Sequence, residues 1–212
     1  MSFADRRHAG EQLGRALVGL RPRQPVVYAL PRGGVPVGFE VARSLSCPLD
    51  VLVVRKVGVP YQPELAMGAV GEGEVTVRND SVIELAGIRD EAFEAVVASE
   101  AIEVRRRVQA YRGDSASIDP AGHTAIVVDD GLATGSTALA AVRVLRARGA
   151  GEVWLAVPVA PRSPLEELEG SVDRLVALER PRWFGAVGSW YRNFTQTTDG
   201  EVRDLLAESR LA

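Results

Sequence analysis

Two adjacent carboxylates, Asp129 and Asp130, end the apolar run of the stretch AIVVDDGLATGST, residues 125–137. Like charges repel each other, and burying either one is costly unless a ligand or a partner neutralises it. Carboxylates accept hydrogen bonds from sugar hydroxyls and hold hydrated Mg²⁺ well. We therefore expect this pair to bind sugar hydroxyls and Mg²⁺, the metal being held through water.

The residues after the acids, 133–137, form a loop of small and hydroxyl-bearing residues that leads into a helix-like stretch. Free backbone N–H groups and the helix dipole at a helix start favour a phosphate, and Thr134, Ser136 and Thr137 add donors. A plain helix cap would explain one acid, but not two acids and a five-residue cradle. The Walker-type and dinucleotide-binding glycine patterns are absent here. Together, the acids and the loop suit a ribose 5-phosphate.

Basic residues occur at two further places that chemistry could use. Arg32 lies in PRGG, and Arg55 and Lys56 follow the apolar run LDVLVV, residues 49–54. Lys56 is the only lysine among 25 basic residues. A compact ammonium at this point suits an anionic oxygen, whereas an exposed lysine that covers apolar surface is the alternative. We expect both residues at the end of the second strand, at the same sheet edge as the acids.

Strand-like and helix-like segments alternate along the chain. Residues 57–74 are rich in glycine and proline, which predicts a flexible loop. Apolar strands that alternate with helices predict a doubly wound, mainly parallel α/β sheet with helices on both faces and a small hood or flexible loop. No linker is evident, so residues 1–212 are predicted to form a single domain. The expected strands are 25–30, 49–54, 75–77, 124–128, 153–160 and 174–179, and the expected helices are 3–20, 35–45, 93–111, 136–148 and 201–209.

The composition limits the class of partner. A net charge of −3 gives no reason to expect binding to nucleic acid or to a membrane surface. No apolar run approaches the roughly 20 residues that span a bilayer, and the first residues lack the apolar core of a signal peptide. These features predict a cytoplasmic protein that binds small molecules.

The stretch VVDDGLATGST resembles the binding motif for phosphoribosyl pyrophosphate (PRPP) in type I phosphoribosyltransferases. A wider likeness, from YALPRGGVPVG through RKVGVPYQPELAMGAV to AVGSWYRNF, extends to a bacterial branch of that family. The resemblance implies a PRPP site in which Asp129 and Asp130 meet the ribose hydroxyls and the loop holds the 5-phosphate. The implied site consists of Arg32, Gly33, Gly34, Arg55, Lys56, Asp129, Asp130, Gly131, Ala133, Thr134, Gly135, Ser136 and Thr137.

The resemblance also implies the reaction, which is Mg²⁺-dependent transfer of ribose 5-phosphate from PRPP to a nitrogen acceptor, with release of pyrophosphate. Arg32, Lys56 and Asp130 would be the catalytic residues, and Asp129 and Asp130 the metal-binding ones. Family members often carry a non-proline cis peptide in the pyrophosphate loop, which would be Pro31–Arg32 here. The segment 57–74 would close over the site, with Glu64 either an acid/base group or a solvated loop residue. Membership further implies a homodimer.

The acceptor stays open at this point. The position of the aspartate that assists the base in hypoxanthine-guanine enzymes is Ala133 here, and the position of their stacking aromatic corresponds to Leu178. Trp183, Phe184, Trp190 and Tyr191 would form a base platform or, equally, pack in the core or a lid. Two other functions compete with transfer to a base or related compound: a PRPP- or nucleotide-sensing regulator without activity, and an enzyme that cleaves PRPP with water.

Overall fold

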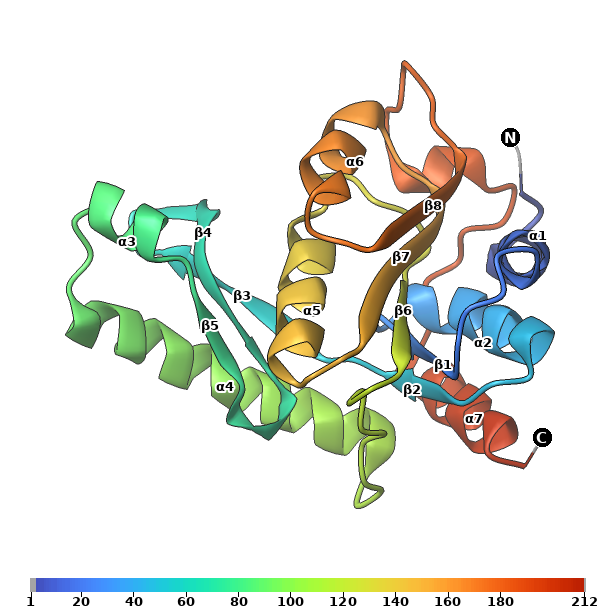
Figure 1. Ribbon diagram of the computed structural model, residues 1–212, viewed down its shortest axis with the longest axis horizontal. Coiled ribbons are helices and arrows are strands. Elements are labelled where there is room, and N and C mark those ends of the chain that lie inside the picture. The colour runs from blue at the N-terminus through green and yellow to red at the C-terminus, as the bar shows by residue number, and fades with distance from the viewer. Residues whose placement is uncertain (1–2, 212) are drawn as a thin grey trace.

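The computed structural model describes residues 3–211, which form a main body and a lobe (Figure 1). Five parallel strands make up the sheet of the main body, in the order β2-β1-β6-β7-β8. Almost every residue of β1, β6 and β7 is buried, because helices cover both faces. The predicted α/β fold with a mainly parallel sheet is confirmed. The strands are β1 (Pro25–Ala29), β2 (Leu49–Val51), β6 (Thr124–Val128), β7 (Glu152–Val159) and β8 (Arg174–Glu179).

Helices form one layer on each face of this sheet (Figure 1). On one face lie α1 (Arg6–Val18), α2 (Gly34–Leu45) and α7 (Asp199–Ser209). On the other lie α5 (Ser136–Ala147) and α6 (Arg162–Glu169). Alternate residues of each strand enter the two hydrophobic clusters, so that Val27 packs with the first layer and Val26 with the second.

Strand order reverses between β1 and β6, since the chain leaves β1 for β2 on one side while β6 pairs on the other. Ligands of open α/β sheets bind beyond the carboxyl ends of the strands at such a point. Here the PRGG loop follows β1 and the acid pair follows β6. The backbone N–H of Leu30 donates to the carbonyl of Val128 over 2.9 Å, which brings the two loops together.

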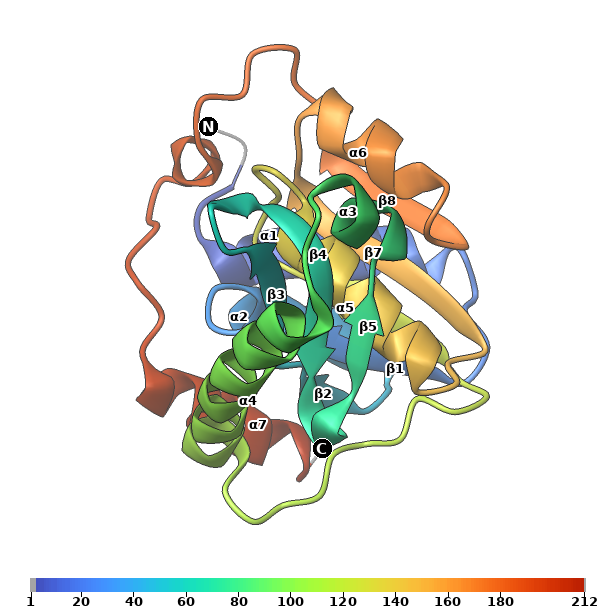
Figure 2. The ribbon, with the colours of Figure 1, turned by 90° about the vertical axis from the view of Figure 1, so that its left-hand side faces the viewer.

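The lobe is a second sheet with two helices of its own. Its antiparallel strands are β3 (Val54–Val59), β4 (Gln62–Gly71) and β5 (Thr76–Arg78), followed by α3 (Asp80–Leu85) and α4 (Asp90–Arg112). Figure 2 shows α4 beside β3 and β4, and its carboxyl end beside α7. α5 packs against the opposite face of the lobe sheet, so this helix contacts both the lobe and the main sheet. The prediction of one domain is not tested by this arrangement and stays a prediction.

Two local predictions were wrong. The strand expected over 49–54 ends at Val51, and the chain then enters the lobe, so Arg55 and Lys56 lie inside β3 rather than at the edge of the main sheet. The segment 57–74 is mostly the β3–β4 hairpin, followed by a short 3-10 turn, rather than a flexible loop. Its glycines provide close packing, since a Cβ on Gly71 would lie 2.6 Å from Val144 of α5. No pattern in the sequence indicated α3 or α6.

Arg112, the last residue of α4, holds the break between β2 and β3 in place. Its guanidinium donates to Asp50 and to Glu72, and also to the carbonyl of Val51. Glu72 in turn accepts from the backbone N–H of Val53. The side chains of Arg112 and Asp50 are 2% exposed and that of Glu72 is 7% exposed. Burial disfavours the charged form of Arg112, but the two carboxylates more than offset this and raise its pKa.

We expect Arg112→Leu to lower the free energy of unfolding by about 3–5 kcal/mol, because it leaves two buried carboxylates without a cation. At about 2–4 °C per kcal/mol for a chain of this size, the melting temperature should fall by roughly 6–20 °C. Arg105→Leu, an exposed position on the same helix, is the matched control and should change little. Equal melting temperatures for the two variants would show that the cluster does not hold the lobe.

No helix among residues 3–211 combines the length and the apolar character needed to cross a membrane.

Candidate active site

Asp129 and Asp130 lie directly after β6, at the carboxyl end of the main sheet. The chain turns sharply there, and the Asp129 Oδ1 accepts the backbone N–H of Asp130 over 2.8 Å. Burial raises the pKa of Asp129 well above its usual value, and the neighbouring charge of Asp130 raises it further. The pKa of Asp130 is also raised by burial, although Arg6 opposes the shift. Burial therefore disfavours the charged form of both acids, and Arg6 offsets only part of this cost.

Arg6, in the first turn of α1, is the counter-ion of Asp130. Its Nε donates to Asp130 Oδ2 over 2.7 Å, and its Nη1 donates to the carbonyl of Thr195 over the same distance. The guanidinium lies 3.8 Å from the centre of the Phe194 ring. Only 11% of the Arg6 side chain and 14% of the Asp130 side chain are exposed. Arg6 was not predicted from the sequence as a site residue, because no local pattern links residue 6 to residue 130.

Tyr191 also holds the backbone at Asp130 in place. Its hydroxyl donates to the backbone carbonyl of Asp130, and its ring packs between Phe3 and Phe194. The side chain is buried, so Tyr191 is a packing residue and not part of a base platform.

The PRGG loop is packed closely against the acids. A Cβ on Gly33 would overlap the Asp130 carboxylate, and one on Gly34 would lie 2.7 Å from the carbonyl of Val128. Only glycine allows this approach of the two loops. The peptide bond between Pro31 and Arg32 is cis, as the resemblance implied. The Nη1 of Arg32 lies 3.5 Å from the carboxylate of Asp199, in the first turn of α7.

Residues 133–137 form the loop that precedes α5. Ala133, Thr134 and Thr137 are exposed, and Gly135 has a positive φ of 74° immediately before the first helical residue. The hydroxyl groups of Thr134 and Ser136 lie 3.1 Å apart. Gly131 is buried beneath the loop, where a Cβ would lie 2.7 Å from Val187. The loop thus presents hydroxyls and the start of a helix to solvent, beside the acids.

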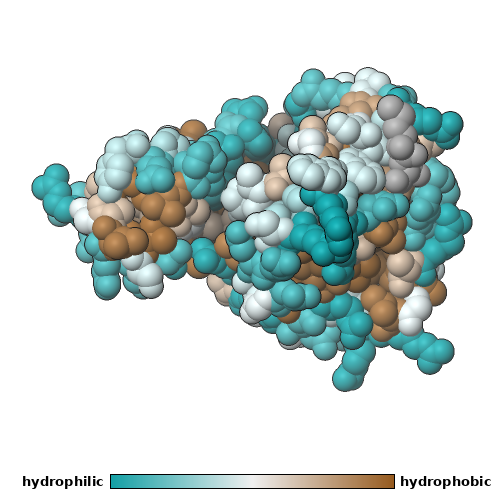
Figure 3. All heavy atoms as spheres, turned by 90° about the horizontal axis from the view of Figure 1, so that it is seen from above, coloured by the Kyte–Doolittle hydropathy of each residue, from teal (hydrophilic) through white to brown (hydrophobic). Residues whose placement is uncertain are grey.

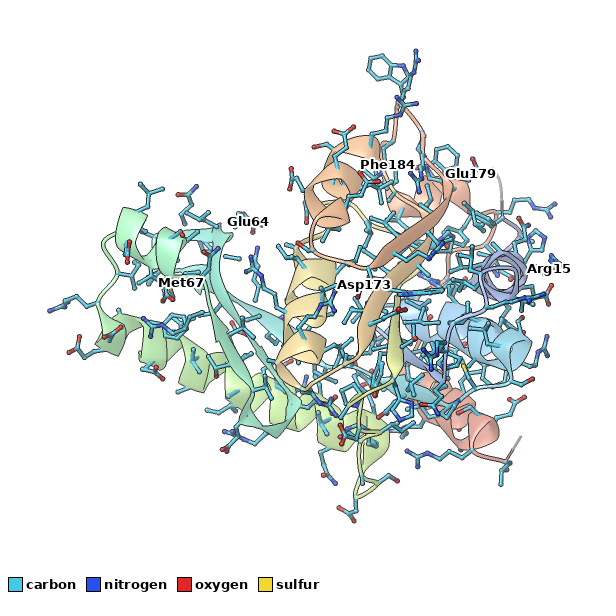
Figure 4. The ribbon with its side chains drawn as sticks, in the orientation of Figure 1. Arg15, Glu64, Met67, Asp173, Glu179 and Phe184 are labelled. Atoms are coloured by element: carbon cyan, nitrogen blue, oxygen red, sulfur yellow. The ribbon has the colours of Figure 1, made fainter. Side chains whose placement is uncertain are left out.

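Arg55 and Lys56 project to opposite faces of β3, as successive strand residues do. The Nε of Arg55 donates to Glu100 of α4 over 2.6 Å. The Nζ of Lys56 donates to Glu64 of β4 over 2.9 Å. Glu64 is 89% exposed, so the interpretation as a solvated residue agrees with its position better than the acid/base role does. Figure 4 shows Glu64 at the end of the lobe near the β3–β4 turn, on the side that faces the main body.

A cavity of about 540 Å³ separates the lobe from the main body. Both basic residues of β3 line it, together with Pro31 of the PRGG loop and Ser136 and Thr137 of the 133–137 loop. Figure 3 shows the molecular surface narrowing between the two parts when viewed from above. The cavity therefore joins Arg55 and Lys56 of the lobe to the 133–137 loop and to the first residue of the PRGG loop. Asp129 and Asp130 are not among its lining residues and lie against Gly33 and Gly34 instead.

The aromatic residues of the carboxyl-terminal segment do not line this cavity. Trp183 is 92% exposed, and the Trp190 indole N–H donates to the carbonyl of Phe184. Figure 4 places Phe184 in the connection after β8, away from the lobe. Leu178 lies in β8 and is half-buried.

The donor set fits a hydrated Mg²⁺ better than a metal enclosed by protein ligands. Residues 3–211 contain no cluster of three or more histidine, cysteine or acidic residues suited to a metal ion. Mg²⁺ is usually bound through one or two carboxylates together with substrate phosphates and water. Asp129 and Asp130, two adjacent carboxylates whose pKa values are raised mainly by burial, meet that description.

These features describe an α/β protein with a candidate ligand site at its strand-order switch point. The model of the phosphoribosyl transferase domain matches residues 8–194, and the chain belongs to that family.

Individual relatives agree with this assignment. A Mycobacterium tuberculosis protein named "Putative phosphoribosyl transferase", found in two strains, is 52% identical over 200 residues. The match covers 94% of this chain and 45% of the relative, so the chain spans less than half the length of these curated relatives. The crystal structure of TT1426 from Thermus thermophilus is 42% identical, with a TM-score of 0.92 over 98% of this chain and 99% of that one. A protein from Aquifex aeolicus shares the fold at 11% identity, with a TM-score of 0.51 over 95% of this chain and 84% of that one.

We expect Asp129→Asn to stabilise the unliganded protein, by an amount that grows with pH. In the folded protein the raised pKa keeps a proton on Asp129 that the unfolded chain has already released, so the free energy of unfolding falls as pH rises above about 4. The amide removes that loss. Thermal unfolding of both proteins between pH 4.5 and 8 checks this, with the exposed Asp114→Asn as control. A melting temperature lowered at every pH would instead assign the carboxylate a structural role.

Proposed function

We propose that this protein is a phosphoribosyltransferase that uses PRPP and Mg²⁺ and transfers ribose 5-phosphate to a nitrogen acceptor, a nucleobase or a related small molecule. The observation that carries the proposal is the position of the half-buried acid pair. It lies at the switch point of the sheet, between the PRGG loop after β1 and the hydroxyl-rich loop before α5. Membership of the phosphoribosyl transferase domain family supports the same reaction.

In this proposal the acids and the 133–137 loop bind the ribose 5-phosphate. Asp129 and Asp130 accept hydrogen bonds from the ribose hydroxyls and hold Mg²⁺ through water. The backbone around Ala133 and Gly135, with the hydroxyls of Thr134, Ser136 and Thr137, holds the phosphate at the helix start. Gly131 allows the loop to turn beneath them.

The pyrophosphate in this proposal is bound by Arg32, Gly33 and Gly34, together with Arg55 and Lys56. Mg²⁺ supplies charge stabilisation to the departing pyrophosphate. Arg32 and Lys56 add fixed positive charge at the same leaving group, while Asp130 orients the ribose. Both cations are paired with exposed carboxylates, Asp199 and Glu64, which an incoming anion can replace. A homodimer, as the family resemblance implies, is also proposed.

Saturating PRPP with Mg²⁺ should stabilise the folded protein. Binding at about 100 times the dissociation constant adds roughly 2.7 kcal/mol, which raises the melting temperature by about 5–10 °C. Asp129→Asn and Asp130→Asn should abolish this shift without unfolding the chain, whereas Asp114→Asn should preserve it. An unchanged melting temperature for the wild-type protein would refute PRPP binding.

The products then separate transfer from the two rival functions. Release of pyrophosphate from PRPP is followed with a panel of nucleobases and other nitrogen acceptors. Transfer predicts release only with an acceptor present, together with a new nucleotide. Release without any acceptor indicates hydrolysis, and a thermal shift with no release under any condition indicates a sensor.

Lys56→Ala should lower turnover more than it weakens PRPP binding, because the ammonium meets the pyrophosphate charge mainly as that group departs. The expected loss of turnover is on the order of 10²–10³-fold, as for other preorganised stabilising groups. Lys56→Arg should recover only part of the lost turnover, since the planar guanidinium does not fit where the compact ammonium did. Steady-state kinetics check this, with Arg55→Ala for comparison. Near-normal turnover in Lys56→Ala beside a large loss in Arg55→Ala would exchange the roles of the two residues.

A further inference from the structure

The cavity between the lobe and the main body has a third basic side chain in its lining, which comes from α4. Arg107 lines it together with Val96 and Glu100 of the same helix. These residues recur at steps of four and seven, so they form one face of α4. Arg107 thus lines the cavity from the lobe, whereas Ser136 and Thr137 line it from the main body. Arg107, Arg55 and Lys56 form a cationic group that we call the lobe cations.

Each lobe cation is paired with a carboxylate, but Arg107 shares its partner with another arginine. Arg55 is paired with Glu100, and Lys56 is paired with Glu64. Arg107 donates to Glu103 over 2.6 Å, but the same carboxylate also receives two hydrogen bonds from Arg106. The two arginines hold the pKa of Glu103 at about 2, well below its usual value. Arg106 and Arg107 therefore share one carboxylate, and of these two arginines only Arg107 lines the cavity.

We propose that Arg107 is a further pyrophosphate-binding residue, and that Glu100 occupies Arg55 in place of the anion until the anion arrives. This inference rests on the proposed function. A guanidinium is suited to such an exchange, because its planar fork binds carboxylate and phosphate oxygens with the same geometry. The lobe thereby contributes binding energy from α4 as well as from β3.

Binding of the anion then replaces existing ion pairs with new ones; it does not neutralise a cation that was unpaired. Each lobe cation gives up a carboxylate that is partly or fully exposed and accepts an oxygen of the anion. Glu100 is 24% exposed and Glu64 is 89% exposed, so each released carboxylate can be hydrated. The gain from the new contact is reduced by the pair that is lost, which for exposed pairs is a small quantity.

Isothermal titration with inorganic pyrophosphate and Mg²⁺ tests the proposal in the full chain. Arg107→Ala should weaken binding about 10- to 100-fold, as expected for loss of a hydrogen bond to a charged group. Arg106→Ala is the matched control, since it loses the same Glu103 partner but does not line the cavity, and it should change affinity less than about twofold. Thermal unfolding of the two variants should be the same.

Removing the competing carboxylate should have the opposite effect. Glu100→Gln should tighten pyrophosphate binding about two- to fivefold, because Arg55 no longer has to be released. Glu94→Gln makes the same charge change at an exposed position of α4 and should leave affinity unchanged.

Three results would overturn the inference. Wild-type affinity in Arg107→Ala would remove the residue from the site, and equal losses in both arginine variants would reduce its effect to overall charge. Weaker or unchanged binding in Glu100→Gln would make Glu100 an orienting partner of Arg55 instead of a competitor. If PRPP stabilises the wild-type protein in any of these cases, the proposed function stands alone. If the wild-type protein binds neither PRPP nor pyrophosphate, both proposals fail.

Discussion

The buried guanidinium of Arg112 determines where the lobe lies. It joins the end of α4 to Asp50 of β2, to Glu72 beyond β4 and to the carbonyl of Val51. Three stretches that are far apart in the sequence therefore meet at one charge. Because that charge is desolvated, its hydrogen bonds have to be nearly complete, and the geometry is correspondingly strict. The cavity that β3 and α4 line depends on this junction.

The proposed ligand site combines strict packing with unfavourable electrostatics. Gly33 and Gly34 let the PRGG loop approach the acid turn so closely that no side chain fits between them. Burial raises the pKa values of Asp129 and Asp130, so their charged forms are disfavoured there. Such an arrangement costs stability in the absence of ligand. Functional sites often carry this cost, which a cationic partner or metal offsets on binding.

Much of the main body followed from local patterns, because strands buried on both faces leave an unmistakable apolar signature. The acid pair, the 133–137 loop and the PRGG loop could be singled out from the sequence because each is a short, contiguous segment. The break after Val51 was not found, because Leu52 and Val53 continue the apolar run and the groups that end the strand come from Glu72 and Arg112. Arg6 and Glu100 were likewise missed, since their contacts with Asp130 and Arg55 are tertiary and leave no pattern in the spacing.

Arg6 and Tyr191, which hold Asp130, come from opposite ends of the sequence, and this affects the order in which the site forms during synthesis. Phe3 and Tyr191 form a parallel bridge. The Arg6 guanidinium contacts the ring of Phe194 and donates to the carbonyl of Thr195. Residues 3–6 therefore reach their positions only together with residues 191–195. Asp130 precedes Tyr191 by 61 residues. At about 5–20 residues per second, a ribosome needs roughly 3–12 s to make that stretch. During this interval Asp130 already has its counter-ion Arg6 in the chain but not the hydroxyl of Tyr191, so the acid turn is completed only when the carboxyl-terminal segment has been made.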